Sequence, residues 1–177
     1  MEIDDLYSVL PRPSNPVGTG DDKLWLRVSE KVGTRLPIDY VYFINSYGTG
    51  TVNDFLVVLN PFASQTYLNL LEQMPRLLSM LRELREEYPE EYPYPLYFEP
   101  GGLLPWGMSD SGDTYCWLTE GSPDLWPVVT VPRHSDMELF EVTMVKFIEA
   151  ALRGQLESSA IPTEFSQRTS FVPASEA

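Results

Sequence analysis

The chain has 177 residues, of which 43% are hydrophobic, and this suits one domain with a substantial core. Acidic residues outnumber basic ones by 26 to 12, which gives a formal net charge of −14. Such a chain should repel nucleic acid and anionic membrane surfaces and attract basic partners, although solubility alone would also explain the acidity.

Targeting segments and disulfides are not expected. No apolar run approaches the roughly 20 residues of a membrane-spanning helix. The first residues are acidic, whereas a secretory signal would be basic and then apolar. One cysteine cannot form an internal disulfide, in agreement with a reducing compartment. We therefore expect a cytoplasmic protein.

The two ends of the sequence differ in composition from the middle. Residues 1–20 hold three prolines and two glycines, a poor start for regular structure. Residues 155–177 are rich in Ser, Thr and Pro and show no sustained apolar period. We expect flexible segments at 1–20 and 155–177, with one patterned domain at 21–154 between them.

Two helices and a strand are predicted in the first part of this domain. Asp21 and Asp22 can cap a helix that ends at Gly33. A second helix is predicted over 36–48, because proline and aspartate suit its first turn and Gly48 can supply its C-cap. Its apolar stripe consists of Tyr40, Phe43, Ile44 and Tyr47. Residues 51–59 are rich in β-formers and predict one strand, placed centrally in the sheet.

Residues 64–88 return to helical spacing. Apolar residues recur every three or four positions, which predicts a helix that faces the core. The segment is too short for a coiled coil. Pro75 lies inside this pattern and lacks the N–H donor that an unbroken helix needs. We therefore expect a kink or two helices.

The stretch PWGMSDSGDTYCW contains a predicted hairpin. Strands at 103–108 and 114–119 flank the loop 109–113, in which Gly112 supplies a positive φ. A calcium loop needs oxygen ligands at alternate positions and a distant glutamate, and Asp110 and Asp113 do not provide that pattern. The pattern therefore favours a structural hairpin over a metal site.

A catalytic cysteine is the other chemical reading of this stretch. Cys116 would need a base, and His134 is the only histidine. No local motif joins the two residues, and the strand position is typical of a small core residue. We expect Cys116 to be structural.

Further strands are predicted at 126–131 and 138–142, and Thr143 can cap a last helix that closes at Gly154. Strands grouped together, with helices before and after them, indicate an α+β fold. We expect a single domain with a mainly antiparallel sheet packed by N-terminal, middle and C-terminal helices.

Residues 36–50, LPIDYVYFINSYGTG, resemble the opening motif of the SMI1/KNR4, or SUKH, superfamily, which reads Leu-Pro-x-Asp-Tyr, an apolar pair and Tyr-Gly-x-Gly. The stretches LLPWGMSDSGDTYCW and DLWPVV resemble its second half, a Gly-rich hairpin followed by Trp-Pro-Val. The final Phe-Ile-x-x-x-Leu helix is also similar. The resemblance covers about residues 21–154 in order and spacing.

This resemblance implies an α+β domain with no catalytic apparatus and no cofactor. Bacterial members are largely immunity proteins that neutralise toxins, often nucleases, of polymorphic or contact-dependent systems, whereas fungal members are regulatory scaffolds. Most motif residues should hold the fold together, and some should line a partner-binding surface. In this sequence they are Leu36, Pro37, Asp39, Tyr40, Tyr47, Gly48, Gly50, Trp106, Gly107, Asp110, Gly112, Asp113, Trp117 and Trp126.

The segment EEYPEEYPYP has no counterpart in the family motif. Tyrosines are favoured interface anchors, and carboxylates suit the lysines and arginines of a toxin. The alternative is that this segment is a solvent-exposed acidic connection between a helix and a strand, with tyrosines that pack only against nearby residues. The candidate partner-binding residues are Glu86, Glu87, Tyr88, Glu90, Glu91, Tyr92 and Tyr94, together with Trp106, Asp110 and Asp113 from the hairpin.

Two function classes follow. The first is an immunity protein that binds a basic toxin domain, and the second is a regulatory or scaffold domain that binds an endogenous protein. The oligomeric state stays open.

The reading of Cys116 as a core residue gives the first prediction. Cys116→Ala should fold and keep any binding that the parent shows, at a cost of about 1 kcal/mol for a small cavity. Urea denaturation and a binding assay would measure both effects. Loss of a turnover activity in this variant would show that the thiol is a nucleophile.

Overall fold

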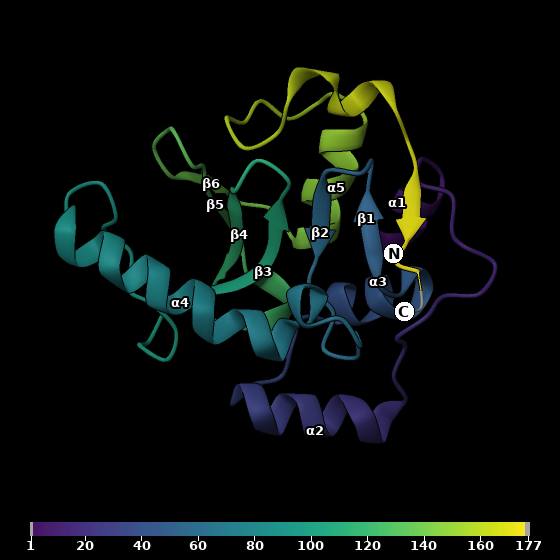
Figure 1. Ribbon diagram of the computed structural model, residues 1–177, viewed down its shortest axis with the longest axis horizontal. Coiled ribbons are helices and arrows are strands. Elements are labelled where there is room, and N and C mark those ends of the chain that lie inside the picture. Colours follow the sequence, from purple (N-terminus) through teal and green to yellow (C-terminus); the bar gives the residue numbers. More distant parts are fainter. Residues whose placement is uncertain (1, 176–177) are drawn as a thin grey trace.

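The structure, a computed structural model, describes residues 2–175, so the extreme ends of the two expected flexible segments lie outside the described part. A seven-stranded sheet runs through the molecule in the order β6-β5-β4-β3-β2-β1-β7 (Figure 1). Every neighbouring pair of strands is antiparallel. The strands are β1 (Gly50–Val52), β2 (Leu56–Val58), β3 (Leu103–Ser109), β4 (Thr114–Leu118), β5 (Val128–Val131), β6 (Glu138–Phe140) and β7 (Phe171–Pro173).

Five helices pack around this sheet. They are α1 (Glu2–Tyr7), α2 (Asp22–Val32), α3 (Ile38–Tyr47), α4 (Leu70–Glu87) and α5 (Met144–Leu152). Short 3-10 turns occur at η1 (Thr66–Leu68), η2 (Pro123–Leu125) and η3 (Thr163–Gln167). The expected α+β fold with an antiparallel sheet is confirmed. Among the described residues, no helix combines the length and apolarity needed to cross a membrane.

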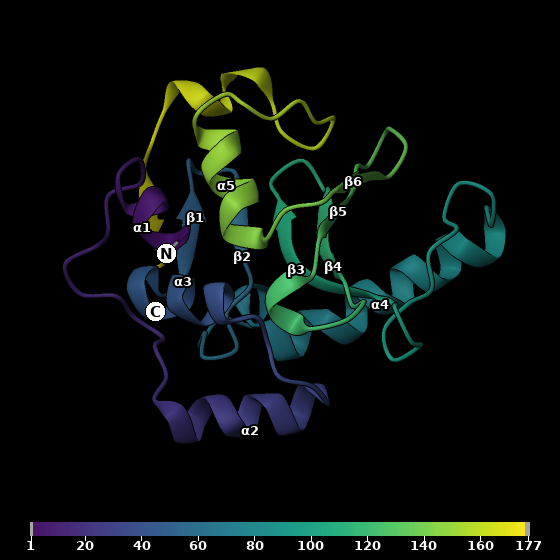
Figure 2. The ribbon, with the colours of Figure 1, turned by 180° about the vertical axis from the view of Figure 1, so that it is seen from behind.

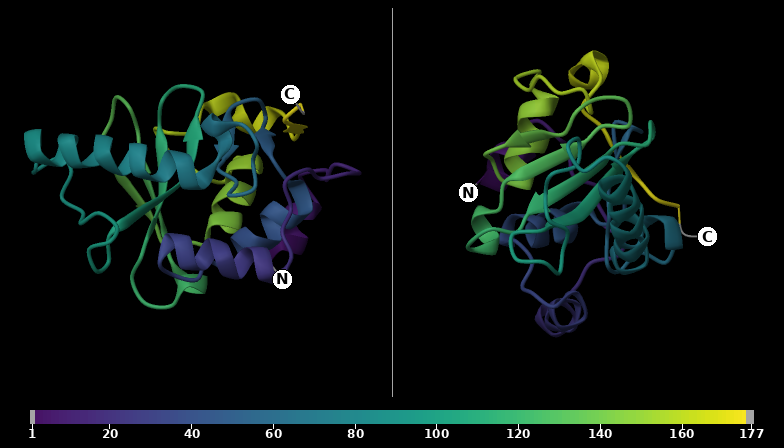
Figure 3. Two further views of the ribbon diagram at one scale, coloured as in Figure 1. Left: turned by 60° about the horizontal axis from the view of Figure 1, so that its bottom comes forward. Right: turned by 90° about the vertical axis from the view of Figure 1, so that its left-hand side faces the viewer.

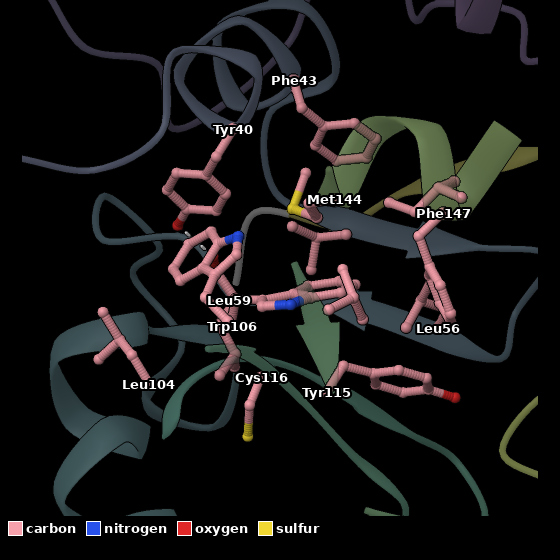
Figure 4. Close-up of a cluster of buried hydrophobic side chains, with 14 of the residues drawn as sticks. Tyr40, Phe43, Leu56, Leu59, Leu104, Trp106, Tyr115, Cys116, Met144 and Phe147 are labelled. Atoms are coloured by element: carbon pink, nitrogen blue, oxygen red, sulfur yellow. Dashed lines mark hydrogen bonds between the residues drawn. The ribbon is translucent and has the colours of Figure 1, made fainter. Parts of the chain in front are cut away.

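Both faces of the central strands are covered. Figure 3 shows the sheet between α4 on one side and α5 on the other, and every residue of β4 is buried. On the α5 side, Phe147 meets Trp106 and Tyr115 with ring centroids 6.3 and 6.0 Å apart. Tyr40 of α3 meets Trp117 edge-on at 5.0 Å. These rings form the centre of the core (Figure 4).

The predicted caps of α2 and the predicted N-cap of α5 are confirmed, whereas Gly48 ends α3 with φ 74° and ψ −149°, outside the left-handed helical region. Asp21 accepts a hydrogen bond from the N–H of Leu24, and Gly33 ends α2 with a φ of 91°. Thr143 accepts a hydrogen bond from the N–H of Lys146 at the start of α5. The stripe predicted for α3 is buried in full.

The prediction of one strand over 51–59 was wrong, because β1 and β2 form a hairpin there. Its turn places Asn53 and Asp54 at φ values of 55° and 54°. The side chain of Asn53 donates to the carbonyls of Phe165 and Arg168 and accepts from the N–H of Ser170. Residues more than a hundred positions away therefore stabilise this turn, and no local pattern reveals them.

Pro75 does not divide the helix that contains it. α4 runs without interruption from Leu70 to Glu87, with η1 before it, so the expected pair of helices is absent from this described segment. Asn69 caps α4 by accepting from two N–H groups, and six side chains on one face are buried. The proline falls in the second turn of α4, and packing of this buried face offsets the one lost hydrogen bond.

The terminal segments are more regular than their composition suggests. α1 buries Ile3 and Leu6, and β7 pairs with β1. Between α5 and β7, Phe165 is 3% exposed and packs against Phe55. The expectation of no regular structure is wrong at α1, η3 and β7. Each of these elements is too short to produce a periodic pattern in the sequence.

Glu138 of β6 binds the segment that follows α5. Its carboxylate accepts hydrogen bonds from the hydroxyls of Thr130 and Ser158 and from the N–H of Ser159. Burial alone would raise the pKa of Glu138, but these hydrogen bonds hold it below its usual value.

This carboxylate should make stability depend on pH. A lowered folded pKa stabilises the protein above the unfolded value of about 4.3, and the contribution is lost as the pH falls through the folded value. Glu138→Gln should cost about 1–2 kcal/mol at pH 7 and much less near pH 3. Urea denaturation at both pH values measures this, with Glu157→Gln, an exposed neighbour, as the control. Equal losses at both pH values would contradict the assignment.

Candidate functional site

The hairpin loop 109–113 is stabilised by buried hydrogen bonds that connect it to the loop after β5. Asp113 is 6% exposed, and its carboxylate binds the hydroxyl of Ser109 and the N–H of Arg133 in the next loop. Gly112 has a φ of 89°, as predicted. Asp110 is exposed, and its N–H donates to the carbonyl of Phe55. Across residues 2–175, no group of three or more His, Cys, Asp and Glu side chains could hold a metal ion.

Trp106 lies in the core rather than on a surface. The register of β3 against β4 shifts between Pro105 and Gly107, so Trp106 occupies a bulge and is 0% exposed. Figure 4 shows its ring among the aromatic side chains of the core. Of the three hairpin residues considered for partner binding, Asp110 alone presents its side chain to solvent.

Cys116 has the surroundings of a core residue. It is 0% exposed, and burial raises the pKa of its thiol, so the neutral form persists. In Figure 4 its sulfur points away from the aromatic cluster. His134 lies on the exposed loop between β5 and β6.

Asp39 connects two helices from inside the protein. Its carboxylate accepts hydrogen bonds from the N–H of Tyr40 at 2.8 Å and from the N–H of Val145, in the first turn of α5, at 2.9 Å. Burial raises the pKa of this group, while the two N–H donors oppose that shift.

The other motif residues also support the fold. The hydroxyls of Tyr40 and Tyr47 donate to the carbonyls of Leu59 and Leu10. The remaining large motif side chains are buried, namely Leu36, Pro37, Trp117 and Trp126. A Cβ on Gly48 would overlap the backbone of Val17, and one on Gly50 would overlap the carbonyl of Val172. A Cβ on Gly107 would lie 2.9 Å from the carbonyl oxygen of Val57.

The acidic candidate residues lie together on a projecting part of the molecule, residues 82–102, which we call the acidic lobe. It consists of the last turns of α4 and the segment that leads back to β3 (Figures 1 and 2). All six glutamates of the lobe are exposed, namely Glu83, Glu86, Glu87, Glu90, Glu91 and Glu99. Tyr88 is 44% exposed, whereas Tyr92 and Tyr94 are half-buried and pack against the core.

Specific contacts fix the return segment to the helices. Glu99 accepts from the N–H of Leu96 at 2.9 Å and forms an ion pair with Arg85 of α4 at 2.8 Å, and both contacts lower the pKa of Glu99. The hydroxyl of Tyr97 donates to the carbonyl of Val32 at the end of α2. The ion pair thus joins the two halves of the acidic lobe, and the hydrogen bond of Tyr97 ties the lobe to α2.

The sequence reasoning missed Phe98. Its side chain is 69% exposed, next to Glu99 and before a Pro-Gly-Gly turn. An aromatic residue beside a proline–glycine turn was the available signal, because such turns lie at the surface.

A hollow with a volume of about 370 Å³ lies between α2 and α3. Apolar side chains form most of its lining, namely Trp25, Leu26, Leu36, Ile38 and Val41. Arg35 at its rim is bound by both oxygens of Asp124. Asp22 also lines the hollow, so its one lining cation, Arg35, is already paired.

The structural role of Asp113 is testable. Asp113→Asn replaces a charged acceptor in a buried joint and should lower stability by about 1–3 kcal/mol. Calcium should change the melting temperature of neither the parent nor Asp113→Asn. The control Asp110→Asn should have the melting temperature of the parent, because the Asp110 side chain is exposed. Differential scanning fluorimetry with calcium or chelator measures this. A calcium-dependent rise in the parent, lost in Asp113→Asn, would establish a metal site.

The SUKH_6 family model, described as SMI1-KNR4 cell-wall, matches residues 22–149. Neither the curated proteins nor the solved structures contain a match. The matched range includes the motif of α3, the hairpin and most of α5. The chain belongs to the SMI1-KNR4 (SUKH) family.

Proposed function

We propose that this protein is a non-enzymatic immunity protein that binds and neutralises a basic toxin domain. The acidic lobe is the observation that carries the proposal. Its exposed glutamates precede and follow Tyr88 in the chain, an ion pair joins its two halves, and a hydrogen bond from Tyr97 ties it to α2. Family membership is consistent with a protein-interaction role.

Charge supports a basic partner. Residues 82–99 contain six glutamates and two arginines, and Arg85 is already paired with Glu99. A surface with this excess attracts a cationic one before contact and orients it during approach. Nucleases bind phosphates through lysines and arginines, so an acidic lobe placed over such a surface would prevent substrate from binding.

Cytoplasmic neutralisation by occlusion requires no chemistry from the immunity protein. The polar groups that resemble a reactive site serve the fold instead, because Cys116 is buried and Asp113 binds Ser109 and Arg133. Binding affinity would then come from the lobe. Its rigid geometry reduces the entropy lost on association.

The salt dependence of binding tests this proposal. The partner to test is the product of the neighbouring gene, and its association is measured by stopped-flow across a salt series. The association rate should fall steeply as salt rises, and the dissociation rate should change less, because exposed charges are screened over about 8 Å at physiological salt.

Replacement of Glu86, Glu87, Glu90 and Glu91 by Gln should reproduce the effect of high salt. The matched control carries the same four-charge change at exposed glutamates elsewhere, namely Glu30, Glu141, Glu157 and Glu164. The control should slow association much less, because its charges lie away from the lobe. Equal effects of the two quadruple variants would place the binding surface outside the acidic lobe. If no toxin domain is bound at all, the alternative of a regulatory scaffold is favoured.

A further inference from the structure

Phe98 is the most exposed aromatic side chain among residues 2–175, at 69% of its full accessible area. A phenylalanine left in water gains nothing for the stability of the fold, because burying such a side chain is worth roughly 1.5–3 kcal/mol. Its position on the return segment of the acidic lobe leaves the ring accessible to a partner.

The backbone around Phe98 is closely held. The N–H of Tyr97 donates to the carbonyl of Leu103, and the N–H of Leu103 donates to the carbonyl of Pro95. The N–H of Glu99 donates to the carbonyl of Leu96 at 2.7 Å. The exposed ring is thus presented on a fixed loop, and an interface that uses it loses little conformational entropy.

One edge of the ring is supported and the rest is open. The rings of Phe98 and Tyr97 lie 4.4 Å apart between centroids. A Cβ placed on Gly33, at the end of α2, would come within 3.5 Å of the Phe98 ring. These contacts set the direction in which the ring projects.

The charges near Phe98 define the chemistry of its partner. The loop that carries Phe98 contacts one cation, Arg85, through an ion pair with Glu99 that neutralises its charge. Glu120 lies on the other side, against Gly101, and the glutamates of α4 continue the acidic surface. The end of α2 that meets the ring carries Lys31, so the excess of carboxylates belongs to the acidic lobe as a whole, whose residues 82–99 contain six glutamates and two arginines.

We propose that Phe98 is the apolar anchor of the acidic lobe, and that it receives an aliphatic side chain from a partner segment whose neighbouring residues are lysines or arginines. This inference rests on the proposed function, since it uses the same lobe. The glutamates set the rate of association, and Phe98 sets the lifetime of the complex.

A synthetic probe tests the inference without the natural partner. The probe is a fluorescent 14-residue helical peptide with leucine on one face and lysine on the other, and fluorescence anisotropy measures its binding to the full chain. Phe98→Ala should weaken binding about tenfold or more through a faster dissociation, with an unchanged melting temperature. Tyr67→Ala is the matched control, because Tyr67 is 64% exposed on η1.

The outcomes separate this inference from the proposed function. Equal peptide affinities for Phe98→Ala and Tyr67→Ala would overturn the role of Phe98, while loss of affinity in the quadruple Gln variant of the lobe would still support an acidic binding surface. Retention of affinity when glutamate replaces lysine in the peptide would refute the basic partner. Self-association of the chain in sedimentation velocity, abolished by Phe98→Ala, would show that a second copy covers the ring and would overturn the proposal.

Discussion

The buried carboxylate of Asp39 fixes α3 and α5, the two helices that place aromatic side chains on the sheet, relative to each other. It accepts one N–H from α3 and one from α5, although Asp39 and Val145 are 106 positions apart. Both donors belong to first turns, where helix dipoles favour a negative charge. When α3 and α5 are held in this way, Tyr40 and Phe147 pack against the aromatic rings of the sheet. An unpaired N–H at either position would cost roughly 1–3 kcal/mol.

The motif of the family is mainly a set of internal supports. Its glycines leave room for the terminal segments, since Gly48 lies against Val17 and Gly50 against Val172. The acidic lobe lies outside this framework and carries none of the motif residues. Support and proposed recognition are therefore separated in the chain, so the lobe can change its charge and its aromatic residues while the core remains the same.

Local rules explain which parts of the fold were predictable. The caps of α2 and α5 and the loop at Gly112 depend on neighbours in sequence, and all were predicted. The turn at Asn53 and the strand β7 depend on each other across more than a hundred residues, so neither has a local pattern. In the candidate site, the acidic segment was evident from composition. The burial of Trp106 and Asp113 and the exposure of Phe98 were not, because each follows from the packing of distant strands and loops.

The pairing of β7 with β1 has a consequence for behaviour at high concentration. The hydrogen bonds between them involve Ser170 and Ala174, so by alternation the backbone groups of Phe171 and Pro173 point away from the sheet. Proline has no N–H to offer an incoming strand. At the opposite edge, the contacts of Glu138 hold the chain after α5 beside β6. The β7 border of the sheet is thus a poor template for strand addition, and the β6 border is only three residues long, two features that disfavour fibrous aggregation.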